Sequence, residues 1–252
     1  MRPRAPGWLA ITLCGVVLHA AIAAPRLTMV SSDFPPYHSA TLPGEGFVTV
    51  LVKAAFRKMG YDIDVKFLPW ARLIAELKAG RYDGGFTFWR STEREAWLAF
   101  SDPVYGSQIG FFSQAQAPRN VADLAQLKSL TIGTVRGYAN PARFDAAQLH
   151  QEEVTDDLTN LRKLAAGRLD LVLIDHDVAQ YLIRHDLPEA MHQITWLEPA
   201  VDVTSLYVVF SKQRPNYARN RDVFNQGLAA LKRSGEFERI LQSYRAGAMP
   251  ER

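Results

Sequence analysis

Apolar and polar positions along the chain follow two periods, one typical of strands and one typical of helices. Short runs of apolar and β-branched residues predict strands, and apolar residues at helical spacing predict helices. The two helices predicted in the first half of the chain are followed by Gly60 and Gly80, which end them. Pro35 and Pro36 predict a loop after the first strand, because proline has no N–H to donate to a sheet. The predicted elements are strands at 27–32, 61–67 and 83–88 and helices at 47–55 and 70–77.

The same alternation returns in the second half of the chain. It predicts strands at 130–134 and 169–174 and helices at 141–147 and 158–166, and the nearly all-apolar last strand favours a parallel sheet buried on both faces. The segment 77–83 is echoed at 164–170, with helix end, glycine, charged turn and strand start in the same order. The echo indicates two similar α/β domains. The alternative explanation is that many α/β proteins use the same residues to end a helix and begin the next strand. Ligands of such sheets bind beyond the carboxyl ends of strands, here near Phe88 and Asp175.

The N-terminus has the layout of a secretory signal peptide. An apolar run at 8–18 follows Arg2 and Arg4 and is shorter than the roughly 20 residues that span a bilayer. Ala21-Ile22-Ala23 provides a cleavage site, so we predict a signal peptide at 1–23 and a mature, periplasmic chain beginning at Ala24. The single cysteine, Cys14, leaves with the signal, which excludes a disulfide, a thiol nucleophile and a cysteine metal site in the mature protein.

Composition and charge fit a globular protein and exclude nucleic-acid binding. Hydrophobic residues make up 48% and charged residues 22% of the chain, which is long enough for one large or two small domains. Arg2 and Arg4 account for two units of the formal net charge of +3, and the remaining basic residues form no stripe. Recognition of phosphates needs such a cluster, and its absence leaves no case for a nucleic-acid partner.

The usual catalytic motifs are missing from the sequence. It contains no G-x-S-x-G, Walker, G-x-G-x-x-G or H-E-x-x-H motif, and its histidines form no i, i+4 pair. Asp175, His176 and Asp177 are adjacent, but neighbouring residues on a helix or strand point in different directions. We therefore predict neither a cofactor nor a metal ion. The acidic cluster at 152–157 is interpreted as a solvated edge followed by a helix N-terminal turn.

The chain is better supplied for recognising a small charged molecule. Arg94 is the candidate cation for a ligand carboxylate, and a surface arginine paired with Glu93 or Glu95 is the alternative. Asp175, at the end of a buried strand, is the candidate anion, and an N-cap of the following helix is its alternative. Four aromatic residues are candidate walls of the site, with a core role as the alternative for each: Phe34, Trp70, Trp89 and Tyr138.

Together these segments resemble the family 3 solute-binding proteins, the periplasmic receptors of polar amino-acid ABC transporters. The likeness covers nearly the whole mature chain, and the order and spacing of its pieces make it specific. The pieces are Asp33-Phe34-Pro35-Pro36-Tyr37, Gly46-Phe47, 77–83, Thr92-Glu93-Arg94, Phe100-Ser101-Asp102-Pro103-Val104-Tyr105, Ile132-Gly133-Thr134-Val135-Arg136-Gly137, 167–170 with Asp175, and 231–237.

The resemblance implies an α/β, two-lobed periplasmic-binding-protein fold of type II. Each lobe would be a mainly parallel sheet flanked by helices, and two hinge strands would cross between the lobes near 111–113 and 206–209. Lobe 1 would comprise 24–111 and 207–252, and lobe 2 would comprise 112–206. Ligand binding closes the lobes of such receptors.

The resemblance also implies roles for single residues. Arg94 would clamp a ligand α-carboxylate, Asp175 would hold the α-ammonium, and Phe34 would stack over the ligand. Trp70, Thr87 and Trp89 would line the first lobe. Tyr138 and Ala139, with backbone N–H groups at a helix N-terminus, stand where the family offers hydroxyl residues. This departure leaves open whether the ligand is an ordinary α-amino acid.

From these residues we expect a monomeric receptor, not an enzyme, that binds a small polar amino acid or related carboxylate between its lobes and delivers it to an ABC-type permease. One alternative is an exported enzyme on the same scaffold, since cyclohexadienyl dehydratases resemble this family; Asp175 or His176 would then supply acid or base catalysis. A sensory or accessory ligand-binding module is the third possibility.

Overall fold

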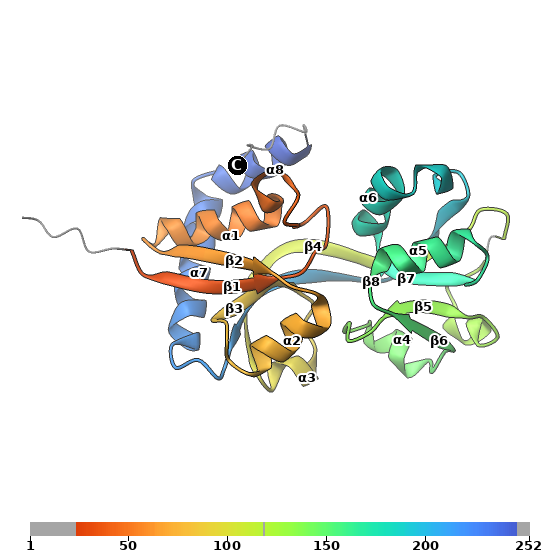
Figure 1. The fold of residues 1–252 in the computed structure, drawn as a ribbon, viewed down its shortest axis with the longest axis horizontal. Coiled ribbons are helices and arrows are strands. Elements are labelled where there is room, and N and C mark those ends of the chain that lie inside the picture. Colours follow the sequence, from red (N-terminus) through yellow and green to blue (C-terminus); the bar gives the residue numbers. More distant parts are fainter. Residues whose placement is uncertain (1–23, 118, 246–252) are drawn as a thin grey trace, which may run out of the picture.

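Two lobes joined by two long strands make up the computed structural model, which describes residues 24–117 and 119–245 (Figure 1). The predicted signal peptide lies outside the described residues. A single mixed sheet of eight strands runs through both lobes in the order β2-β1-β3-β8-β4-β7-β5-β6. The strands are β1 (Arg26–Ser31), β2 (Asp62–Phe67), β3 (Gly84–Phe88), β4 (Leu98–Gln114), β5 (Ile132–Val135), β6 (Gln151–Val154), β7 (Leu171–Asp175) and β8 (Ile194–Ser211).

Helices cover the sheet in each lobe. Lobe 1 contains α1 (Phe47–Lys58), α2 (Trp70–Lys78), α3 (Thr92–Glu95), α7 (Tyr217–Arg233) and α8 (Glu236–Arg245), and lobe 2 contains α4 (Ala142–Ala146), α5 (Asp157–Ala165) and α6 (His176–Asp186). Short 3₁₀ turns occur at η1 (Pro43–Glu45), η2 (Leu124–Leu127) and η3 (Pro188–Ala190). In lobe 1, α1 and α7 pack so closely that a Cβ on Gly227 would lie 2.0 Å from the carbonyl oxygen of Ala55. Only glycine permits this approach.

The long strands β4 and β8 connect the lobes. They are antiparallel to each other, and in lobe 1 β8 also pairs with β3, whereas in lobe 2 β4 also pairs with β7. Between these regions, residues 103–108 of β4 pair only with residues 203–207 of β8. The stretch at 111–113, where the resemblance implied the first crossing, already pairs with β7, so β4 crosses earlier than expected. A pair of strands with no other neighbours is the most easily bent part of the sheet.

The two lobes repeat one local structure, as the sequence echo predicts. In each lobe a helix ends at a glycine with positive φ, Gly80 at 68° and Gly167 at 67°. The aspartate that follows accepts a backbone N–H from the neighbouring segment: Asp83 from Thr28 at 2.8 Å, and Asp170 from Thr131 at 2.9 Å. Positive φ is easily adopted only by glycine, so this residue ends the helix and lets the chain turn into the strand.

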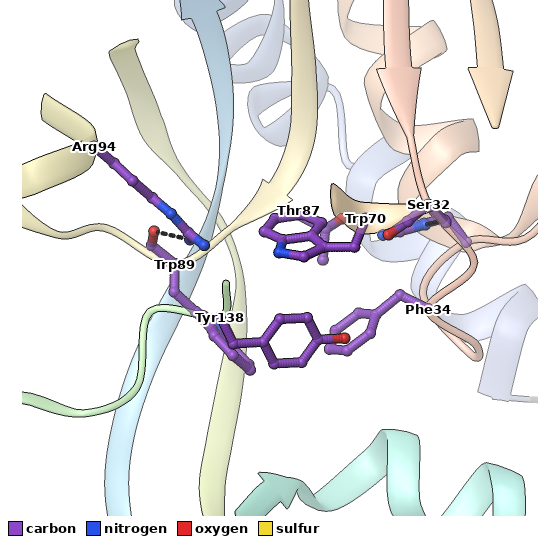
Figure 2. Close-up of a pocket in the computed structure, with 8 residues that line it drawn as sticks. Ser32, Phe34, Trp70, Thr87, Trp89, Arg94 and Tyr138 are labelled. Atoms are coloured by element: carbon purple, nitrogen blue, oxygen red, sulfur yellow. Dashed lines mark hydrogen bonds between the residues drawn. The ribbon is translucent and has the colours of Figure 1, made fainter. Parts of the chain in front are cut away.

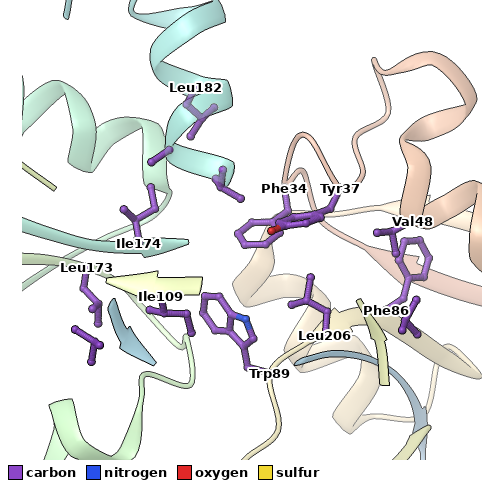
Figure 3. Packing of buried hydrophobic residues seen from close by; sticks show 14 of the residues in the cluster. Phe34, Tyr37, Val48, Phe86, Trp89, Ile109, Leu173, Ile174, Leu182 and Leu206 are labelled. Carbon is purple, nitrogen blue, oxygen red and sulfur yellow. The ribbon is translucent and has the colours of Figure 1, made fainter. Parts of the chain in front are cut away.

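The hydrophobic core continues from one lobe into the other. Leu173, Ile174 and Leu182 of lobe 2 belong to the same cluster of buried residues as Val48 and Phe86 of lobe 1. Figure 3 shows the rings of Phe34, Tyr37 and Trp89 lying between these groups, beside Ile109 of β4 and Leu206 of β8. The lobes therefore touch through aromatic side chains at the place where a ligand site is expected.

Candidate functional site

A cavity lies where the lobes meet; it is partly open, and its empty space of about 290 Å³ includes adjoining solvent. Figure 2 shows its walls, and most of its lining residues follow the carboxyl ends of lobe 1 strands. Ser32, Phe34 and His38 belong to the loop after β1, Thr87 and Trp89 to the end of β3, and Trp70 begins α2. Arg94 comes from α3, and Tyr138, after β5, is the contribution of lobe 2. Strand ends of an open α/β sheet form such a site because the loops that leave them diverge.

Six of the eight residues predicted for the site line this cavity. They are Phe34, Trp70, Thr87, Trp89, Arg94 and Tyr138. Ala139 packs against the core instead and does not line the cavity. Helix α4 begins only at Ala142, so Tyr138 and Ala139 precede the helix and do not open it. The N–H of Tyr138 donates to the carbonyl of Val135 at 3.1 Å.

Arg94 is a buried cation without a carboxylate partner. The residue is only 5% exposed, and no carboxylate of the described residues lies within 4 Å of its guanidinium. The guanidinium donates to the carbonyls of Trp89 at 2.9 Å and of Gly137 at 3.1 Å. Burial lowers the pKa of Arg94 to about 10, which still leaves it charged at neutral pH.

The surface alternative for Arg94 does not describe the structure. Glu95 pairs with Arg90, and Glu93 lies 3.6 Å from Lys78. The guanidinium instead lies against the rings of Trp70 and Phe88, 5.2 and 5.4 Å from their centroids. Two carbonyl contacts occupy only part of its five N–H donors, which leaves capacity for a bidentate contact with an anion.

Aromatic side chains fill much of the space between the lobes. The ring of Tyr138 meets Phe34, Trp70 and Trp89 edge to face, at centroid distances of 6.3, 5.5 and 5.4 Å (Figure 2). Its hydroxyl donates to Asp157 at 2.9 Å, and burial raises the pKa of Asp157 to about 7 although that hydrogen bond opposes the shift. The indole of Trp70 donates across the cleft to the Gly137 carbonyl at 3.0 Å. The lobes are in contact in this structure.

Asp175 lies next to the cavity but does not line it. Four donors occupy its carboxylate: the hydroxyls of Tyr37 and Ser107 and the backbone N–H groups of Asp177 and Val178. The last two make it the N-cap of α6, as its alternative reading predicts. The residue is 1% exposed, and burial raises the pKa of Asp175 to about 6. The expected contact with a ligand ammonium stays a prediction.

Two lining residues, Ser32 and His38, were not predicted. Both follow the first strand, next to the predicted proline loop, and a polar residue in such a loop reads as solvent-exposed. His38 is 1% exposed and packs edge-on against Phe86, with ring centroids 5.3 Å apart. The only feature of the sequence that connected His38 with the site was that it follows the predicted site residue Phe34 by four positions.

The described part of the chain has neither a cluster of metal-ligating residues nor a helix that could span a membrane. No group of three or more His, Cys, Asp or Glu residues there is arranged to hold a metal ion. His176 packs beside Trp196, with centroids 5.0 Å apart, and contacts Asp177, away from the cavity. None of the helices between residues 24 and 245 is long and apolar enough to cross a membrane.

Comparison with known proteins decides the family. A model of the bacterial extracellular solute-binding proteins, family 3, matches residues 27–247. The chain belongs to this family. This family 3 protein is 22% identical over 250 residues to the arginine-binding extracellular protein ArtP of Bacillus subtilis (strain 168), an alignment that covers 94% of this chain and 93% of that protein. The resemblance described from the sequence motifs is confirmed.

Solved structures with the same fold confirm the predicted architecture. A histidine kinase sensor domain with similarity to periplasmic binding proteins matches the family 3 protein with a TM-score of 0.77 at 21% identity, covering 91% of this chain and 99% of that chain. The substrate-binding protein of an amino acid ABC transporter matches with a TM-score of 0.69 at 22% identity, covering 86% and 98%. The fold is therefore shared by transport and sensory proteins.

Proposed function

We propose that the protein is an exported, monomeric receptor that closes its lobes over a small carboxylate, either an amino acid or a related acid, and delivers it to an ABC-type permease. The observation that carries the proposal is the buried guanidinium of Arg94, which faces a cavity between the lobes and has no carboxylate of the described residues within 4 Å to neutralise it. A buried charge is costly unless it is paired, and a ligand carboxylate supplies the missing partner.

The position of the cavity supports a closure mechanism. Lobe 1 provides Arg94 and most of the aromatic walls, and lobe 2 provides Tyr138 and the Gly137 carbonyl. A ligand that touches both lobes binds the closed form more tightly than the open form, and only such a difference shifts the equilibrium. The relatives named above include an arginine-binding protein and the substrate-binding protein of an amino acid ABC transporter, which supports an amino acid or a related compound as the ligand class.

Isothermal titration of ligand-stripped protein with a panel of amino acids and other small carboxylates tests the proposal. An Arg94→Met variant should bind at least about thirtyfold more weakly, because orphaning one partner of a buried pair costs about 2–5 kcal/mol. Arg90→Met is the matched control, since Arg90 is exposed and paired with Glu95. The absence of any heat from the whole panel, or equal binding by both variants, would contradict the receptor function.

Binding without turnover is part of the proposal. Among the described residues that line the cavity there is no carboxylate, and His38 is the one histidine. Burial lowers the pKa of His38 to about 4, which makes it a weak base at neutral pH. Incubation with prephenate or arogenate should therefore give no aromatic product, and formation of one would favour the enzyme alternative.

A further inference from the structure

Two polar atoms in the cavity wall have no hydrogen-bond partner. Nε2 of His38 and Oγ1 of Thr87 are both buried and find no hydrogen-bond partner among the described residues, and both residues line the same cavity as Arg94. A buried polar atom that makes no hydrogen bond is costly and rare in native proteins. The missing partners of these two atoms are explained if a molecule bound in the cavity forms hydrogen bonds with both.

The hydrogen bonds of His38 fix which nitrogen accepts. Its Nδ1 lies 2.6 Å from the carbonyl oxygen of Ser32 and 3.1 Å from Oγ of Ser31. Since a carbonyl only accepts, Nδ1 carries the proton and Nε2 presents its lone pair. Burial lowers the pKa of His38 to about 4, against the opposing effects of the Ser32 hydrogen bond and of nearby Asp33, and so keeps the ring neutral at physiological pH. Nε2 is therefore an acceptor that needs an O–H or N–H donor.

Thr87 is held in its place by an unusual backbone conformation. Its φ is 66°, a left-handed value that β-branched residues rarely adopt, and the pairing of β3 with β8 is irregular between Phe86 and Phe88. Such strained residues cluster at binding and catalytic sites. The hydroxyl of Thr87 can donate or accept, so it complements a ligand hydroxyl that donates to His38.

The charges around the cavity decide which donor fits. Arg94 is the charged residue of the lining, and a ligand carboxylate neutralises it. An ammonium group on the same ligand would add a second positive charge beside Arg94, and none of the lining residues carries a negative charge to neutralise it. Asp175 is outside the lining and already accepts from four donors, and Asp157 lies behind Tyr138, whose hydroxyl it holds. An uncompensated buried charge is far more costly than a buried hydroxyl.

We propose that His38 and Thr87 form a subsite for an uncharged O–H or N–H donor, so that the ligand is a carboxylic acid carrying such a donor, such as a 2-hydroxy acid, and not a zwitterionic amino acid. This inference rests on the receptor function proposed above. The aromatic walls formed by Phe34, Trp70 and Trp89 add a preference for a flat or apolar body. His38 is then the residue that determines specificity.

Matched ligands test the charge and the hydroxyl separately. L-phenylalanine, L-3-phenyllactate and 3-phenylpropanoate share a ring and a carboxylate and differ only in an ammonium, a hydroxyl or a hydrogen at C2. Titration calorimetry at pH 7 should find phenyllactate about tenfold tighter than phenylpropanoate, the value of one hydrogen bond, and phenylalanine the weakest of the three. L-glutamate, 2-hydroxyglutarate and glutarate form a second series without a ring.

A variant of His38 tests the contact itself. His38→Phe keeps a ring but removes the acceptor, so it should weaken the hydroxy acid about tenfold and leave the deoxy acid unchanged within about twofold. His176→Phe is the matched control, because His176 lies outside the cavity, and it should change neither affinity. Equal losses for both ligands, or no loss for either, would overturn the subsite.

The remaining outcomes separate this inference from the receptor function. If an amino acid binds more tightly than its hydroxy counterpart and the binding depends on Arg94, the inference is wrong and the receptor function stands. If no member of either series and no compound of the wider panel binds, the receptor function fails and the inference falls with it. Should His38→Phe not fold, ¹⁵N NMR of the unaltered protein decides: Nε2 must be unprotonated between pH 5.5 and 8, and a proton on Nε2 would overturn the proposal.

Discussion

Replacement of Asp175 distinguishes a structural carboxylate from a ligand-binding one. Asp175→Ala removes the N-cap of α6, which costs about 0.5–2 kcal/mol, and leaves the hydroxyls of Tyr37 and Ser107 without an acceptor, at about 1–3 kcal/mol each. Burial raises the pKa of Asp175 to about 6, so removing this carboxylate also removes the cost of burying its charge, which offsets part of the loss in stability. A net loss of about 2–4 kcal/mol is expected, which lowers the melting temperature by about 5–15 °C in a chain of this size.

Asp175→Asn should lose less, because its amide oxygen still caps the two backbone N–H groups of α6. Thermal unfolding followed by circular dichroism, without ligand and at pH 7.5, measures both variants. Asp177→Ala is the control. Asp177 is exposed, lies in the first turn of α6 and contacts His176, and such exposed interactions contribute little, so the melting temperature should change by about 2 °C or less. An unchanged melting temperature for Asp175→Ala would refute the reasoning. Loss of ligand affinity with full stability in Asp175→Asn would instead support the ammonium role.

Three further changes test other parts of the molecule. The raised pKa of Asp157 means that its ionisation between about pH 4 and 7 destabilises the folded protein. Asp157→Asn removes this penalty, so its stability relative to the unaltered protein should rise with pH in that window, by at most about 1.4 kcal/mol per pH unit, as measured by melting temperatures at a series of pH values. Trp70→Phe removes a cross-cleft hydrogen bond and should shift the ratio of open to closed forms about fivefold, visible by small-angle scattering. Gly227→Ala should cost about 1–3 kcal/mol in urea unfolding because its Cβ would strike Ala55, whereas Gly106→Ala, with no atom within 4 Å, should cost little.

The order of helices and strands was predictable because local periodicity determines it. Predicted helices at 47–55 and 70–77 correspond to α1 and α2, and the predicted strand at 169–174 corresponds to β7. The glycine and aspartate echo was also predictable, since a helix stop and a strand start depend on neighbouring residues. Only family resemblance indicated two lobes joined by hinge strands, because a strand that serves two lobes has no local signature.

Most residues that line the candidate site could be predicted from the sequence, but their hydrogen-bond and packing partners could not. Arg94 and the aromatic residues follow strand ends, where chain topology brings ligands. The occupation of Asp175 by Tyr37 and Ser107 depends on contacts between segments far apart in the sequence, and no spacing reveals them. The burial of His38 likewise results from packing against Phe86 across the sheet.

Strand β8 lies between β3 and β4 in the sheet although it is the last strand of the chain. During translation, β1, β2 and β3 therefore leave the ribosome long before the strand that joins them to β4, and α7 and α8 follow later still. The second lobe, from β5 to η3, is synthesised without interruption and can fold first. A nascent chain stalled before residue 194 would expose an unpaired edge of β3 and the apolar face of α1, which makes it a client for chaperones.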